Sequence, residues 1–229
     1  KQDLYTISSN ELAEIFKGVD VVFHLAALAR VQPSIDNPMP YNDANVTATL
    51  NVLYASYQSG VQRVVYSASS SCYGNATKTP QEEHDPVNPL SPYGLQKYIG
   101  EQYCKLFSEI YNLDTVSLRY FNVYGERMSL SGAYCLVTGI FARQMQEGQN
   151  LTITNDGNQK RDFTYVGDVV NGIIKLMEIK DAVGQVINIG NPNEITINDL
   201  AQLVIKKTNS NSNIEYISYE KAYGIGFED

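Results

Sequence analysis

Short apolar runs rich in β-branched residues alternate with helical stretches along most of this 229-residue chain. Three of these runs, at 19–25, 63–67 and 115–119, have the composition of strands that are buried on both faces. Helical patterns lie between them and after them. This order predicts β-α-β units with right-handed crossovers, and therefore an α/β fold with a doubly wound parallel sheet.

The remaining elements are expected from the same periodicity. Helices are expected over 10–17, 44–57, 91–112, 134–147, 166–178 and 197–207, and further strands over 151–154, 186–189 and 214–217. Capping signals precede three of the helices, namely Ser8 with Glu11, Ser91 with Pro92, and Thr196 with Asp199. Gly60 is expected to end the second helix.

Charge and cysteine content exclude several classes of protein. With 17 basic against 25 acidic residues, the chain carries a net charge of −8. It lacks the basic surface that nucleic acids and anionic membranes require, so we expect neither partner. The three cysteines lie far apart and His24 and His84 stand alone, which disfavours a disulfide framework and a metal site. No signal peptide or membrane span is visible, so reduced thiols and a cytoplasmic location are expected.

Ligands of doubly wound folds bind at the carboxyl ends of the strands, so the loops after Leu25, Ser67 and Arg119 are the places to inspect. The second loop is rich in serine, and the helix after it begins with Tyr93 and Lys97 on one face. A chain with 17 tyrosines is expected to contain about one such pair by chance. The informative feature is the position of the pair, directly after a polar loop at a strand end.

Tyr93 and Lys97 together can perform acid–base chemistry. A phenol, with a pKa of about 10, is a poor base at neutral pH, but a nearby ammonium favours the phenolate. Tyr93 could then take a proton from a substrate hydroxyl while a serine from 69–71 binds the same oxygen. The hydride that leaves the same carbon needs a cofactor as acceptor, because no side chain accepts hydride. The alternative is that the serines only satisfy their own backbone.

Other loop residues have two interpretations each. Asn122 follows the third strand and is a plausible substrate ligand. Lys160 and Arg161 are adjacent cations in an acidic chain, which suits a phosphate-bearing ligand, but they are equally consistent with a solvated pair or with pairing to Asp162. His24, inside a predicted strand, is expected to be a core histidine with a hydrogen-bond partner.

Five segments in this order resemble the extended short-chain dehydrogenase/reductase family. They are HLAA at 24–27, the serine-rich loop with YG at 73–74, SPYGLQK at 91–97, RYFNVYG at 119–125 and RDFTYVGDV at 161–169. Within that family the chain looks most like the UDP-glucose and UDP-N-acetylglucosamine 4-epimerases, and YGIGFED at 223–229 also resembles a late segment of such enzymes. The resemblance implies NAD as cofactor and a UDP-sugar as substrate.

The resemblance also implies roles for individual residues. The catalytic residues would be Ser69, Tyr93 and Lys97. The cofactor-binding residues would be Asp3, Leu4, Leu25, Ala26, Ala27, Asn45, Ser67, Tyr93, Lys97, Tyr120 and Val123. The substrate-binding residues would be Ser69, Asn122, Leu136, Val137, Thr152, Thr154 and Arg161, with no metal. The helices at 44–57 and 91–112 would form the interface of a homodimer.

Two departures from the family pattern bear on the reaction. The 4,6-dehydratases of the family carry an acidic pair before the YG tyrosine, whereas 69–72 here holds no carboxylate, which disfavours water elimination. Where several 4-epimerases carry a lysine near the cofactor, this chain has Ala29 followed by Arg30. Another nucleotide-sugar epimerase, a decarboxylase, a reductase and a non-catalytic NAD-binding scaffold remain as alternatives.

The glycine-rich turn that binds a dinucleotide pyrophosphate is missing from the sequence, because none of its 16 glycines forms a GxGxxG pattern. The first residue is Lys1. We therefore expect a fragment without the first half of a Rossmann-like sheet and without a short tail, which binds NAD poorly and is inactive by itself. The expected domains are a partial NAD-binding domain over 1–121 and 164–192, and a smaller α/β substrate domain over 122–163 and 193–229.

Overall fold

A computed structural model describes residues 3–75, 78–130 and 135–218 of the chain. The chain divides into two compact units, one formed by 1–121 with 167–189 and the other by 122–166 with 190–229. These units are divided after residues 121, 166 and 189, whereas the domain boundaries expected from the sequence lie after residues 121, 163 and 192.

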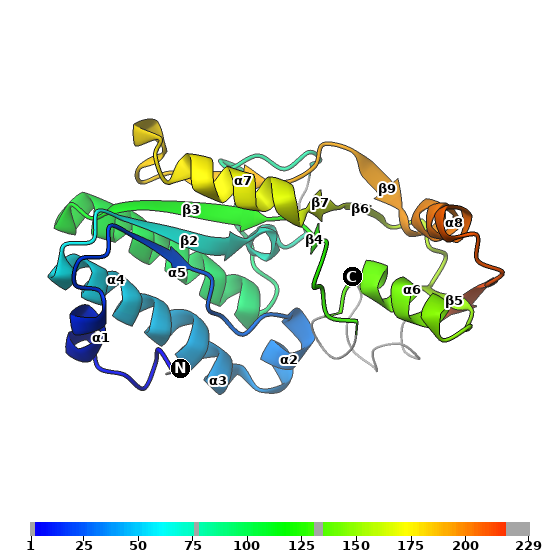
Figure 1. The fold of residues 1–229 in the computed structure, drawn as a ribbon, viewed down its shortest axis with the longest axis horizontal. Helices are drawn as coiled ribbons and strands as arrows, with labels where there is room; N and C mark the ends of the chain where they lie inside the picture. The colour runs from blue at the N-terminus through cyan, green and yellow to red at the C-terminus, as the bar shows by residue number, and fades with distance from the viewer. Residues whose placement is uncertain (1–2, 76–77, 131–134, 219–229) are drawn as a thin grey trace. The chain divides into compact units, whose positions relative to one another are not determined.

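The first unit is built on a parallel sheet of four strands in the order β1 (Val21–His24), β2 (Arg63–Ser69), β3 (Asp114–Tyr120) and β8 (Val186–Ile189). Every residue of β2 is buried, as its apolar sequence predicts for a central strand. Helices lie on both faces of this sheet, with α4 (Ala48–Ser59) and α5 (Pro92–Tyr111) on one side and α7 (Val166–Leu176) on the other (Figure 1). The predicted α/β fold with a parallel sheet is confirmed.

The core of this unit lies between the sheet and α4 and α5. It contains Leu53, Val61, Val64, Tyr66, Ala68, Cys104, Phe107 and Leu113. A second cluster joins α1 (Ser9–Ile15) to α4 through Leu12, Val52 and Ala55. Among the described residues, no helix is long and apolar enough to cross a membrane.

The predicted helix caps are present. The Ser8 hydroxyl accepts a hydrogen bond from the Glu11 N–H at 3.2 Å, and the Glu11 carboxylate accepts the Ser8 N–H at 3.1 Å. The Ser91 hydroxyl accepts the Gly94 N–H at the start of α5, and the Thr196 hydroxyl accepts the Asp199 N–H at the start of α8 (Ile197–Thr208). Gly60 ends α4 in the left-handed region, with a φ of 75°. These local signals identify most helix ends correctly.

The segment between β1 and α4 differs from the prediction. The helix expected from residue 44 begins as a π-helical segment, η1 (Asp43–Thr47), and only then continues as α4. Two short helices precede it, α2 (Val31–Asp36) and α3 (Pro38–Asn42), which the sequence analysis missed. Their prolines interrupt the helical periodicity, so no pattern of sufficient length was visible.

The second unit combines short strands with two helices. Strands β5 (Leu151–Thr154) and β10 (Ile214–Ile217) are parallel, and β6 (Lys160–Asp162) runs antiparallel to β9 (Glu194–Thr196). Strand β4 (Val123–Tyr124) pairs with β7 (Thr164–Tyr165). Phe141 of helix α6 (Val137–Gln146) packs in one cluster with Leu151 and Ile153 of β5 and with Leu200 and Ala201 of α8. The expected start of α6 at residue 134 lies outside the described residues, as do residues 223–229.

His24 makes the stability of the first unit depend on pH. Its ring is buried, with Nε2 2.9 Å from the Thr49 hydroxyl, as expected for a core histidine. Burial, assisted by the charge of Lys97, lowers the pKa of His24 to about 3. Between these two pKa values, about 3 in the folded chain and near 6.5 in the unfolded chain, His24 is protonated only in the unfolded chain. The contribution of neutral His24 to the free energy of unfolding is complete above pH 6.5 and is lost as the pH falls toward 3.

We therefore expect His24→Gln to flatten the pH dependence of unfolding. Below pH 6.5 the wild-type free energy of unfolding should fall by about 1.4 kcal/mol per pH unit because of His24, and the variant should lack this part of the slope. Urea titrations at pH 7.5, 5.5 and 4.5 measure it. His84→Gln, at an exposed position, serves as the control. Equal slopes in wild type and His24→Gln would contradict the prediction.

Candidate active site

The serine-rich segment follows the carboxyl end of β2. The strand extends to Ser69, two residues further than expected, and a 3₁₀ turn, η2 (Ser70–Tyr73), comes next. The Ser69 hydroxyl accepts the Ser71 N–H at 3.2 Å and donates to the Ser71 hydroxyl at 3.1 Å. These serines therefore do satisfy part of their own backbone, while Ser69 stands at the strand end where a ligand would approach.

Helix α5 begins directly against this segment. A Cβ built on Gly94 would lie 2.6 Å from the Ser71 carbonyl oxygen, so only glycine allows the first turn to approach so closely. This contact places Tyr93, whose N–H donates to the Ser34 hydroxyl at 3.1 Å, beside the serine turn. Ser34 belongs to α2 and is fully buried. The first turn of α5 is thus held by two segments that are distant in sequence.

Lys97 lies one helical turn after Tyr93 and is almost completely buried. Its ammonium donates to the Ser67 carbonyl oxygen at 2.8 Å and lies 5.1 Å from the centre of the Tyr66 ring. Gly100 makes room for that ring, because a Cβ there would lie 2.2 Å from the Tyr66 hydroxyl. Burial lowers the pKa of Lys97 to about 8, although the Glu101 carboxylate opposes this shift.

Asn45 fixes the loop that follows β1. Its side-chain carbonyl accepts the Leu28 N–H at 2.8 Å, and its amide donates to the Leu28 carbonyl at 2.9 Å and to Gln96 at 3.1 Å. The π-helical turn η1 carries this side chain, and such turns occur frequently at functional sites. Asn45, expected near the cofactor, therefore connects the backbone of one predicted cofactor loop to α5.

The remaining predicted cofactor residues of the first unit suit a flat dinucleotide. Leu25 is 57% exposed at the carboxyl end of β1, where Ala26 is exposed and Ala27 half-buried. In the described part of the chain Lys97 donates only to Ser67, so two further ammonium protons can bind the hydroxyls of a ligand. Tyr120 bonds to the Ser67 hydroxyl at 3.2 Å. These residues fit NAD.

Asp3 and Leu4 lie before α1, where the Leu4 carbonyl accepts a hydrogen bond from Asn51 at 2.9 Å. The Asp3 side chain is exposed. Contacts of its backbone carbonyl with Thr6 and Ile7 form a turn. The segment is thus anchored to α4 through its main chain.

In the second unit, the predicted substrate residues lie mostly on strand ends and on α6. Asn122, with a φ of 35°, donates to Asp162 at 3.2 Å. The Thr152 hydroxyl accepts a hydrogen bond from Gln144 at 2.7 Å, and Arg161 donates to the neighbouring Lys160 carbonyl at 2.9 Å. The other predicted substrate residues are half-buried, namely Leu136 and Val137 at the start of α6 and Thr154 in β5. Val123 of β4, a predicted cofactor residue, is half-buried as well.

The sequence analysis missed a buried ion pair between Arg119 of β3 and Glu101 of α5. Two hydrogen bonds, at 2.9 and 2.7 Å, join the two side chains. The available signal was the arginine itself, since a charged residue inside an apolar strand requires a buried partner. Glu101 stands four residues after Lys97 and hence on the same helix face.

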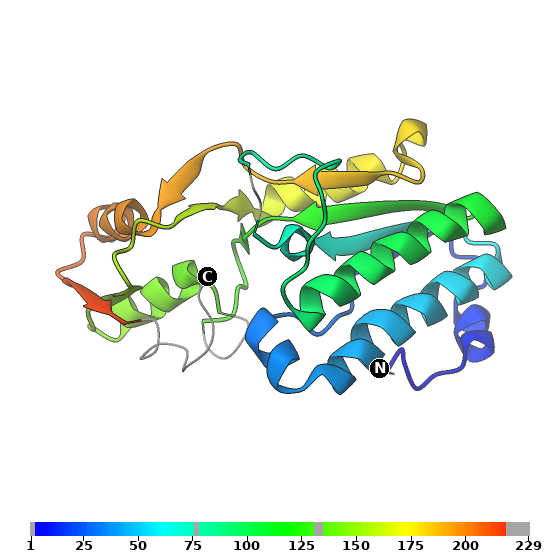
Figure 2. The same ribbon diagram turned by 180° about the vertical axis from the view of Figure 1, so that it is seen from behind.

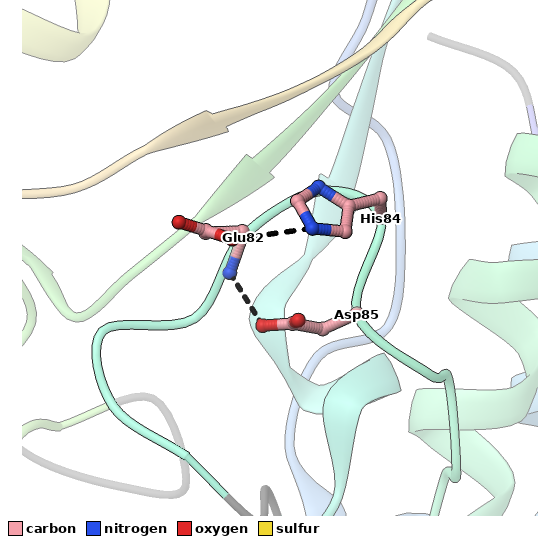
Figure 3. A group of neighbouring side chains, drawn as sticks. All are labelled: Glu82, His84 and Asp85. Carbon is pink, nitrogen blue, oxygen red and sulfur yellow. Dashed lines mark hydrogen bonds and ion pairs between the residues drawn. The ribbon is translucent and has the colours of Figure 1, made fainter.

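His84, which the sequence analysis treated as isolated, lies beside two carboxylates on an exposed loop (Figure 3). Its Nε2 is 3.2 Å from Glu82, and the Asp85 carboxylate accepts the Glu82 N–H at 2.7 Å. The Lys78 ammonium forms ion pairs with the carboxylates of Glu82 and Asp85, at 2.9 and 3.0 Å. A lysine already supplies the cation of this exposed cluster, so we assign it as a surface ion-pair network.

Comparison with known proteins decides the family. The model of the NAD dependent epimerase/dehydratase family matches residues 3–190. The chain belongs to this family. Membership confirms the predicted resemblance and its cofactor, because enzymes of the family are NAD-dependent.

Individual relatives are similar over most of the chain. A putative UDP-glucose 4-epimerase of Methanocaldococcus jannaschii is 40% identical over 82% of this chain and 61% of its own length. A UDP-N-acetyl-alpha-D-glucosaminuronate decarboxylase of Bacillus cytotoxicus is 33% identical over 97% of this chain and 70% of its own length. The structure of UDP-N-acetylglucosamine 4-epimerase from Methanobrevibacter ruminantium M1, in complex with UDP-N-acetylmuramic acid, aligns with a TM-score of 0.90 at 33% identity, over 100% of this chain and 76% of that one.

Proposed function

We propose that this protein is a nucleotide-sugar epimerase that inverts C4 of a UDP-sugar, either UDP-glucose/UDP-galactose or the N-acetylated forms. The observation that carries the proposal is the buried Lys97 ammonium, one turn from Tyr93 and bound to Ser67 beside Ser69. A constellation of hydroxyl, phenol and ammonium at a strand end suits removal of a proton from an alcohol. The family and its sugar-nucleotide relatives support the substrate class.

In this proposal Tyr93 takes the proton of the C4 hydroxyl and later returns it. Lys97 favours the phenolate because its positive charge lowers the pKa of a neighbouring phenol. Ser69 donates a hydrogen bond to the same oxygen and keeps it oriented. The chemistry that NAD supplies when bound is acceptance of the C4 hydride and its return to the opposite face of the ring. Because the hydride returns, no net reduction of the cofactor is expected.

The resemblance assigns the other predicted residues to the cofactor and to the substrate. For the cofactor, the proposed ligands are Asp3, Leu4, Leu25, Ala26, Ala27, Asn45, Ser67, Tyr120 and Val123, with Tyr93 and Lys97. For the nucleotide sugar, they are Ser69, Asn122, Leu136, Val137, Thr152, Thr154 and Arg161, the arginine binding the diphosphate. These assignments are proposals that rest on the resemblance to the family.

A decarboxylase, favoured by the relative from Bacillus cytotoxicus, is the second candidate. The test incubates full-length protein with UDP-glucose, UDP-N-acetylglucosamine and the corresponding uronate, and analyses the products by chromatography while NADH absorbance is followed. C4 epimers without net NADH support the proposal. Release of carbon dioxide from the uronate alone identifies a decarboxylase, and net NADH turnover identifies a reductase. Binding of NAD without any conversion would identify a scaffold and overturn the proposal.

We also propose that α4 and α5 form the interface of a homodimer. Their outer face carries exposed apolar side chains, among them Tyr54, Leu106 and Ile110, the last 66% exposed. They line a hollow of about 360 Å³ together with Tyr103 and Tyr111. The two helices lie side by side (Figure 2), so a second copy could pack against both and complete a four-helix bundle.

The dimer proposal predicts that Ile110→Arg produces a monomer. A buried, unpaired guanidinium in the interface would cost several kcal/mol of association free energy. Light scattering coupled to gel filtration measures the mass. Ile174→Arg, on α7 and similarly exposed, is the matched control and should leave the mass unchanged. A monomeric wild type, or a dimer that tolerates Ile110→Arg, would contradict the proposal.

A further inference from the structure

The ion pair between Glu101 and Arg119 is buried more deeply than any other pair in the described part of the chain. Their side chains are 0% and 3% exposed. The Arg119 guanidinium also lies 4.5 Å from the centre of the Tyr73 ring and donates to the Glu83 carbonyl at 3.3 Å. The pair is thus fixed by several elements, and breaking it would leave a charge in the core.

The Lys97 side chain is buried as well, and it belongs to the same helix as Glu101. Glu101 follows it by one helical turn, so the two side chains are neighbours on α5. Among the described residues, the titratable groups that face Lys97 are His24 from β1, Tyr66 from β2, and Glu101 and Cys104 from α5, while Tyr93 lies one helical turn before it. His24 is neutral above pH 6, and burial raises the pKa values of Tyr66 and Cys104, so these three are neutral at pH 7. Apart from Tyr93, whose phenolate the proposed function requires, Glu101 is therefore the anion among these groups.

The balance of buried charge around Lys97 depends on Glu101. With Glu101 present, two cations share one carboxylate. Without it, Arg119 and Lys97 would be buried together, and no other carboxylate of the described residues acts on either of them. An arginine does not lose its proton in a protein, so the excess charge would be relieved at Lys97, the group that can become neutral.

We propose that Glu101, held in place by Arg119, is a positioning residue that keeps Lys97 in its ammonium form one helical turn from Tyr93. Glu101 does not touch the reacting atoms and acts only through Lys97. This inference rests on the proposed function, because the charge of Lys97 bears on catalysis only if Tyr93 is the acid–base residue. The protonation state of Lys97 itself is measured without substrate.

The test follows the titration of Lys97 by NMR, in full-length protein with ¹³C-labelled lysine, from the chemical shift of the Lys97 Cε. Lys97→Arg identifies the signal by its absence. The wild-type midpoint is expected at about 8. Glu101→Gln should lower it by about one to two pH units, since removal of a neighbouring opposite charge has an effect of this size. Glu101→Asp keeps the charge but withdraws it by one methylene, so the decrease should be smaller.

A matched control is provided by a partly buried arginine pair of the same sheet, Arg63 with Asp114. Asp114→Asn removes the carboxylate 3.1 Å from Arg63, and it should leave the Lys97 midpoint unchanged because Asp114 does not face Lys97. The basic limb of the pH–activity profile should move with the midpoint in Glu101→Gln, which a merely structural role would not produce. If Glu101→Gln does not fold, the decrease in Glu101→Asp carries the test.

The outcomes separate this inference from the proposed function. An unchanged Lys97 midpoint in folded Glu101→Gln or Glu101→Asp overturns the inference, whether or not the wild type converts UDP-sugars. A lowered midpoint in a protein that converts no UDP-sugar supports the inference about the charge and overturns the proposed function alone.

Discussion

Replacement of Tyr93 by phenylalanine is expected to lower the rate of UDP-sugar interconversion by a factor of about 10² to 10⁴. The variant lacks the only atom of this side chain that can exchange a proton with the C4 hydroxyl. The ring, half-buried at the first turn of α5, keeps its packing, and the Tyr93 N–H keeps its bond to Ser34. The loss should therefore be in kcat, with KM and the unfolding midpoint close to the wild-type values.

The matched control for this variant is Tyr98→Phe. Tyr98 is half-buried in the same helix, five residues further along, and none of the proposed steps uses its hydroxyl. Both variants are assayed in full-length protein with UDP-glucose and UDP-N-acetylglucosamine. If Tyr93→Phe retains the wild-type rate with either sugar, Tyr93 is not the acid–base residue.

Replacement of Arg119 by methionine is expected to lower the free energy of unfolding by about 3–5 kcal/mol, because it leaves the Glu101 carboxylate buried without its partner. Burial already raises the pKa of Glu101 above its ordinary value, and Arg119 opposes that shift. In the variant only Lys97 would remain to compensate the charge. Urea unfolding followed by circular dichroism measures the difference.

Two comparisons make the Arg119 result specific. The double replacement Arg119→Met with Glu101→Met removes both charges and should recover much of the lost stability, since an apolar pair of similar volume replaces a buried ion pair at little cost. Lys105→Gln breaks an exposed pair with Glu109 in the same helix and should cost less than about 1 kcal/mol. A cost for Arg119→Met no greater than for Lys105→Gln would contradict the assignment.

Local patterns predicted the strands and most helix ends because each depends on neighbours in sequence. The bounds of β5, β8 and β10 are those expected. Helix α5 starts at the expected cap and ends within one residue of the expected end. Ser91 and Pro92 fix its first turn and Asn112 ends its last turn, and each acts on its immediate neighbours in sequence. The same reasoning failed between residues 31 and 47, where three prolines and a π-helical turn break the periodicity that such predictions require.

For the site, the sequence by itself determined that Tyr93 and Lys97 share one face of a helix, directly after a polar segment at a strand end. It also determined the α/β class, because apolar strands that alternate with helices can bury both faces only in a parallel sheet with helices on either side. Only the tertiary structure decided which groups surround the pair. Asn45 meets Gln96, Ser34 meets Tyr93, and Arg119 meets Glu101 across 51, 59 and 18 residues of chain. Such contacts depend on how α2, η1 and β3 pack against α5, and no local periodicity encodes that packing.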